Sequence, residues 1–100
     1  MDVKITKNGE KTLVVLTGRV DTTNADQMQK DLTPLMELKS SNIELDCTDM
    51  EYTSSQGLRI FLLLQKTVTA NGGQLVMTHM KPQVKEVFDI TGFSNIIKIQ

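Results

Sequence analysis

The sequence predicts an α/β protein with a mixed sheet of about five strands and about three helices packed against it. Two strand-like segments are joined by Asn8-Gly9, which is a strong short-hairpin signal. Helical and strand-like segments then alternate, which implies right-handed crossovers between parallel strands. No repeat or linker divides the 100 residues. We therefore expect a single domain, residues 1–100, with the element order β-β-α-β-α-β-α-β.

The expected strands are short segments in which apolar and polar residues alternate, or in which β-branched residues cluster. They are residues 3–7, 12–17, 43–47, 74–78 and 96–99. A short turn at residues 49–51 is expected to end the third strand.

Apolar residues recur at helical spacing in three other segments. The first helix is expected over residues 22–38, capped by Thr22 or Thr23, with Pro34 kinking or ending it near Thr33. The second follows Gly57, reaches Ala70 and stops at residues 71–73. The third is expected to begin at Pro82, to bury residues 84, 87 and 88, and to close at Gly92.

Composition excludes several classes of function. The net charge is −1 and the basic residues are scattered, so a nucleic-acid surface is not expected. No apolar run is long enough to span a membrane, and the N-terminal segment lacks the order of a signal peptide. The single Cys47 cannot form an internal disulfide bond. These features favour a cytoplasmic protein that interacts with neither membranes nor nucleic acid.

The sequence also lacks the groups of an enzyme. His79 is the only histidine, it follows a predicted strand, and no Gly-x-Ser-x-Gly motif accompanies the serines. Cys47 alternates into the core, which favours an inert thiol. No metal-ligand spacing and no glycine-rich phosphate loop occurs. We expect a non-enzymatic protein without a cofactor.

The most informative residues surround the start of the second helix. Thr53 and Gln56 have the spacing of a capping box, which would place Ser54 and Ser55 at the first two helical positions. Free amides at a helix start favour a negative group, so a phosphoserine would be well placed there. The simpler alternative is that Ser54 or Ser55 only caps the helix.

The second helix carries more apolar surface than one buried face requires. A helical wheel groups Gly57, Ile60, Phe61, Leu64 and Val68 into one buried stripe. Leu58 and Leu62 flank this stripe, and Leu63 lies on the far side with Arg59 and Thr67. An exposed leucine beside the serines could contribute to a docking patch. Asp21 should lie near the same helix start. There it could order the loop that carries Ser54 and Ser55, called the serine loop below, or bind a cation of a partner.

The segment around the serines and several other segments resemble a known family, the STAS domains of bacterial anti-sigma factor antagonists. Residues 45–50, followed by Tyr-Thr-Ser-Ser-Gln-Gly-Leu at 52–58, are similar to its signature of a strand Asp, a short turn, an aromatic residue and Ser-Ser-x-Gly-Leu. Residues 16–21, 71–75 and 84–93 resemble three further segments of the family. The resemblance therefore extends over the whole chain and implies the STAS fold.

The resemblance implies a partner switch. In this family the unphosphorylated antagonist binds an anti-sigma factor that is also a serine kinase of the histidine-kinase-like ATPase type, and the sigma factor is released. The kinase then phosphorylates one antagonist serine, which weakens binding, and a PP2C-type phosphatase reverses the change. The register places the acceptor at Ser55. Ser54, which stands where the family often has Asp, is the second choice, and Gln56 replaces the family's second Ser.

Taken together, these considerations predict a monomer that docks on its partner through the serine loop and the second helix. The expected partner-binding residues are Asp21, Thr53, Ser54, Gln56, Gly57, Leu58, Arg59, Leu62 and Leu63. Two alternatives remain open. One is a STAS scaffold that is never phosphorylated, as in a transport or stressosome-like assembly. The other is a STAS domain that binds a nucleotide or another small ligand.

Overall fold

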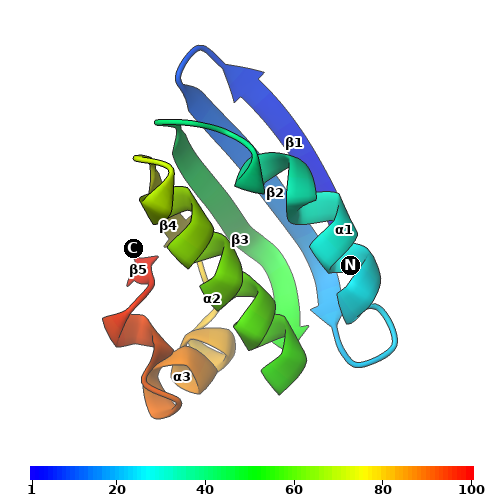
Figure 1. The fold of residues 1–100 in the computed structure, drawn as a ribbon. Helices are drawn as coiled ribbons and strands as arrows, with labels where there is room; N and C mark the ends of the chain where they lie inside the picture. The colour runs from blue at the N-terminus through cyan, green and yellow to red at the C-terminus, as the bar shows by residue number, and fades with distance from the viewer.

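The computed structural model describes residues 1–100 and confirms the predicted class and order of elements (Figure 1). The elements are β1(Asp2–Asn8), β2(Lys11–Val20), α1(Ala25–Met36), β3(Asn42–Thr53), α2(Ser55–Ala70), β4(Gln74–Thr78), α3(Pro82–Ile90), the 3₁₀ helix η1(Phe93–Asn95) and β5(Lys98–Ile99). No helix combines the length and the apolar character needed to cross a membrane.

The five strands form one mixed sheet in the order β1-β2-β3-β4-β5. β1 and β2 form the predicted antiparallel hairpin, and the following strands pair in parallel. Because each crossover is right-handed and moves to the next strand in the same direction, the helices lie on the same face of the sheet. Figure 1 shows α1 and α2 side by side across that face, with the start of α2 near the end of β3.

The core lies between the sheet and the helices and contains 21 buried apolar residues. Alternate residues of the central strands, such as Leu45 and Met77, point into it. Phe61 of α2 and Phe88 of α3 contact each other there, with ring centroids 6.2 Å apart. These two rings connect the second and third helices through the core.

The expected turn at residues 49–51 is wrong, because β3 continues through it to Thr53. The pairing with β2 instead shifts twice: Val15 pairs with Asp46 but Thr17 with Asp49, and the next shift follows Gly18. Each shift inserts one extra residue into β3, as in a β-bulge. The turn-forming residues are thus accommodated inside a bent strand, which extends β3 to the start of α2.

The predicted boundaries of the first helix also need correction. α1 begins at Ala25 with Asn24 as its N-cap residue, whereas Thr22 and Thr23 belong to the preceding turn. Pro34 does not end the helix, which continues to Met36. Pro34 is exposed, so the carbonyl group that it leaves without an amide partner can be hydrated.

The last strand is shorter than expected. Residues 93–95 form η1, and β5 contains only Lys98 and Ile99 instead of residues 96–99. Gly92 has a φ of +81°, a left-handed conformation that ends α3 and redirects the chain into η1. Ile97 is nevertheless buried, so its apolar character reflects packing against the core.

Candidate functional site

Ser54, and not Thr53, is the N-cap residue of α2. The backbone of Ser54 is extended, and its Oγ accepts a hydrogen bond from the Gly57 amide at 3.2 Å. The Ser54 amide donates to the carbonyl oxygen of Val20 at 2.9 Å, which attaches the helix start to the end of β2. The predicted capping box between Thr53 and Gln56 is therefore wrong, because the attachment to β2 positions Ser54 one residue later as the cap.

Thr53 and Gln56 have other partners. Thr53 is buried at the end of β3, and its hydroxyl donates to the carbonyl oxygen of Ser54 at 3.1 Å. The Gln56 side-chain amide donates to Asp26 Oδ1 at 3.5 Å and so connects α2 to α1. Gln56 thus contributes to the junction between two helices.

Ser55 is the first residue of α2, one position earlier in the helix than predicted, and its side chain is exposed. The hydrogen bonds that hold this turn use Thr53, Ser54 and Gln56, and none uses the Ser55 hydroxyl. The first turn of α2 contains no acidic residue. A negative group on Ser55 would therefore lie beside helix amides that carry positive partial charge.

Gly57 allows the helix start to pack closely against the sheet. A Cβ atom at this position would lie 2.4 Å from Thr53 Oγ1 and 2.7 Å from Val20 Cγ1. Any side chain would collide with these two buried residues. Gly57 therefore sets the position of the serines relative to the ends of β2 and β3.

The structure confirms that Asp21 lies near the start of α2, since it directly follows Val20, which accepts from the Ser54 amide. Its carboxylate accepts hydrogen bonds from the Thr23 hydroxyl at 2.6 Å and from the Thr23 amide at 2.9 Å. These bonds hold the pKa of Asp21 below its ordinary value. The carboxylate thus orders its own turn and makes no hydrogen bond to the serines.

Four predicted residues share the exposed face of α2: Ser55, Arg59, Leu62 and Leu63, which together are called the serine surface below. Their spacing of three to four residues places them in a row along the helix. Leu63 is 43% exposed and Leu62 is partly exposed. This surface joins a free hydroxyl, a cation and apolar side chains.

Leu58 does not belong to this surface, because it is only 3% exposed. The helical wheel places it at the edge of the buried stripe. In the structure α2 contacts both α1 and α3, so its buried arc is wider than a single face. Thr53 and Gly57 are likewise buried, and they position the loop through the close packing of the Gly57 backbone against the Thr53 side chain.

One side-chain pair near the serine loop was not predicted from the sequence. Arg19 and Tyr52 are partners in the β2–β3 register, and the Arg19 guanidinium lies 4.5 Å from the centre of the Tyr52 ring. Tyr52 is 40% exposed. A cation stacked on an aromatic ring at the surface is a favourable arrangement. The pair could be recognised only once the bulged register of β3 was known.

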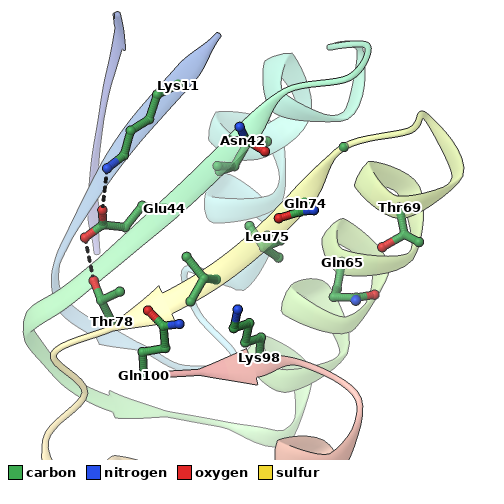
Figure 2. Close-up of a pocket in the computed structure, with 13 residues that line it drawn as sticks. Lys11, Asn42, Glu44, Gln65, Thr69, Gln74, Leu75, Thr78, Lys98 and Gln100 are labelled. Atoms are coloured by element: carbon green, nitrogen blue, oxygen red, sulfur yellow. Dashed lines mark hydrogen bonds and ion pairs between the residues drawn. The ribbon is translucent and has the colours of Figure 1, made fainter.

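One hollow lies away from the serine surface. It has a volume of about 540 Å³ and is lined mostly by polar residues from the starts of β3 and β4, the last turns of α2 and the chain end. Figure 2 shows Glu44 between Lys11 and Thr78, at 3.4 Å and 2.7 Å. Along α2, Thr69 of this hollow is about 21 Å from Ser55.

The remaining reactive side chains form no site. His79 is exposed just beyond β4, as predicted. No group of three or more His, Cys, Asp or Glu side chains could hold a metal ion. Cys47 is fully buried, as predicted, and burial together with the nearby Asp46 charge raises its pKa to about 12.

We therefore expect Cys47 to resist thiol reagents. In the folded protein at pH 8, labelling should be slower by orders of magnitude than in denaturant, because only the thiolate reacts. A thiol in the unfolded chain ionises near pH 9, so the stabilisation from the protonated buried thiol is complete below that pH. It should decrease as the pH rises from about 9 towards about 12. Exposed Lys66→Cys is the control and should label rapidly. Rapid native labelling of Cys47 would contradict the prediction.

Comparison with known proteins identifies the family. The sequence profile of the STAS domain matches residues 2–100. This chain belongs to the STAS domain family. The Bordetella bronchiseptica protein BtrV, described as an anti-sigma factor antagonist, is 36% identical over 87 residues, which are 87% of this chain and 75% of BtrV. The anti-sigma-B factor antagonist of Bacillus subtilis is 29% identical over 99% of this STAS domain and 90% of its own length.

Solved structures show the same STAS fold. A Thermotoga maritima protein described as an anti-sigma factor antagonist has a TM-score of 0.86 at 19% identity, covering 97% of this chain and 84% of its own. The antagonist SpoIIAA in its unphosphorylated form gives 0.80 at 17% identity, with 99% and 88% coverage. The phosphorylated form of Bacillus SpoIIAA gives 0.72 at 14% identity, with 99% and 91% coverage.

Proposed function

We propose that this STAS domain is an anti-sigma factor antagonist whose serine surface is switched by phosphorylation of Ser55. The observation that carries the proposal is that only one of the two serine hydroxyl groups is used within the fold. Ser54 Oγ caps α2 through the Gly57 amide, whereas the Ser55 hydroxyl is exposed and makes no hydrogen bond within the loop. The names of the relatives and the phosphorylated form of SpoIIAA support the same function.

In the proposed cycle, the unphosphorylated serine surface binds an anti-sigma factor of the histidine-kinase-like ATPase type, which releases its sigma factor. The Ser55 oxygen then attacks the γ-phosphorus of ATP bound to that partner. The bond from this phosphorus to the bridging oxygen breaks, ADP leaves, and the serine proton passes to a base of the kinase. No His or carboxylate hydrogen-bonds Ser55, so this chain supplies an acceptor and a surface.

The phosphate changes binding mainly through charge. Phosphorylation adds close to two negative charges to a surface that must lose water on docking, and burying an uncompensated charge is costly. The amides at the start of α2 can accommodate the phosphate without refolding of the helix. The affinity for the anti-sigma factor is therefore expected to fall while the fold persists. A PP2C-type phosphatase would restore the free hydroxyl.

The experiment that tests the proposal compares variants of the two serines. The purified protein is incubated with ATP and an anti-sigma factor kinase of the histidine-kinase-like ATPase type from the same organism, and the added phosphate is located by mass spectrometry. Ser55→Ala should abolish the modification. Ser54→Asn should retain it, because Asn removes the hydroxyl but still caps a helix. Phosphate on the Ser55→Ala protein, or none on the wild-type protein, would contradict the proposal.

A small-ligand function would use a different part of the molecule. The hollow in Figure 2 is lined by amide side chains and by Lys98, far from Ser55 along α2. Stabilisation against thermal unfolding by ATP or GTP alone would favour that function. A scaffold function would leave Ser55 unmodified in the kinase experiment.

A further inference from the structure

Ser55 and Arg59 are four residues apart on α2, and both are exposed. Side chains with this spacing are neighbours on a helix surface, with about 5–6 Å between their Cβ atoms. Arg59 has no carboxylate partner in the structure, since the two ion pairs are Lys11–Glu44 and Lys85–Asp89. The cation beside the acceptor hydroxyl is therefore uncommitted in the unphosphorylated protein.

We propose that Arg59 is the internal counter-ion of phosphorylated Ser55. Long side chains of a helix lean towards its N-terminus, so the Arg59 guanidinium is within reach of a phosphate on Ser55. An anion N-terminal to a cation at this spacing is the more favourable order. A guanidinium can also donate two parallel hydrogen bonds to one phosphate group. This role rests on the proposed phosphorylation of Ser55 and extends it to a second residue.

The pairing gives the switch two components. Before modification, the Arg59 guanidinium is free to bind a carboxylate of the docking partner. After modification, the phosphate appears and Arg59 is withdrawn to it. The local charge of Ser55 and Arg59 together changes from +1 to about −1. The exposure of Leu62 and Leu63 does not depend on this pairing, so the change acts on the ionic part of the serine surface.

Three other charged groups near the loop already have partners. Asp26 on α1 accepts from the Gln56 amide, Asp21 accepts from Thr23, and Arg19 stacks on Tyr52. Asp26 would repel a phosphate on Ser55, but it does so equally in any variant of Arg59. Substitution of Arg59 therefore isolates the proposed pair.

The test introduces phosphoserine at position 55 by genetic encoding, so that no kinase is needed. Phosphorus NMR then follows the second ionisation of the phosphate, which occurs near pH 6 in a free phosphoserine. Arg59→Gln should raise the midpoint by about 0.3 of a pH unit, the size expected for an exposed pair at this spacing. Arg59→Lys should restore part of the difference. High salt should reduce it.

Lys66→Gln is the matched control. Lys66 is exposed on the same face of α2, about 16 Å along the helix from Ser55, and its loss changes the net charge equally. An unchanged midpoint in Arg59→Gln, or an equal shift in Lys66→Gln, would overturn the proposal. Because phosphoserine is encoded, this result is independent of the kinase experiment: a shift without kinase activity would retain the pair but refute the proposed cycle.

Discussion

Phe61→Ala should lower the free energy of unfolding by about 3–5 kcal/mol, as truncation of a buried aromatic ring generally does. Phe61 is completely buried, and its ring lies 6.2 Å from that of Phe88, at an interplanar angle of 34°. The substitution would leave a cavity between α2, α3 and the sheet. It would also remove the favourable contact of the two tilted rings. Urea unfolding followed by circular dichroism measures the loss.

Leu63→Ala is the matched control for Phe61→Ala. Leu63 is on the same helix but 43% exposed, so its truncation should change stability by no more than about 0.5 kcal/mol. The same variant should weaken docking if the serine surface is the binding surface. An equal loss of stability in both variants would show that the division of α2 into buried and exposed faces is wrong.

Gly57→Ala should destabilise the protein by about 1–3 kcal/mol, the usual effect of overpacking. Alanine normally favours a helix over glycine by about 1 kcal/mol, so propensity alone predicts the opposite sign. The new Cβ atom would lie 2.4 Å from Thr53 Oγ1 and 2.7 Å from Val20 Cγ1, and both of these residues are buried and β-branched. Neither side chain can move aside easily.

Helix propensity predicts that Gly57→Ala raises the stability, whereas the close packing predicts that it lowers the stability. The sign of the measured change therefore distinguishes the two. Thermal and urea unfolding should both show a loss, whereas Ser55→Ala, two residues earlier and exposed, should change stability little. Because relief of the clash would displace the start of α2 from β2, phosphorylation of Ser55 should also become slower in Gly57→Ala. A protein that is more stable than the wild type would refute the close packing.

The serine loop itself could be predicted only in part. The sequence predicted a helix start among residues 53–57, which the structure confirms. The acceptor at Ser55 follows only from the family resemblance and stays a prediction. The sequence did not reveal which polar residue caps the helix, because Thr53, Ser54 and Ser55 are all good caps. The hydrogen bond from the Ser54 amide to Val20 decides this, and Val20 is more than thirty residues away along the chain.

The sequence by itself determined the existence of the β1–β2 hairpin, the strand at residues 74–78 and the helix start at Pro82, because each depends on the conformational preferences of a few adjacent residues. The loop of the hairpin lies one residue later than the Asn8-Gly9 signal, at Gly9 and Glu10, because Asn8 pairs with Lys11. Tertiary structure decided the rest. The pairing with β2 turned the expected turn of β3 into two bulges, and the tertiary packing of α2 buried Leu58 while leaving Leu63 exposed. These outcomes depend on contacts between segments distant in sequence, which local propensity and periodicity do not encode.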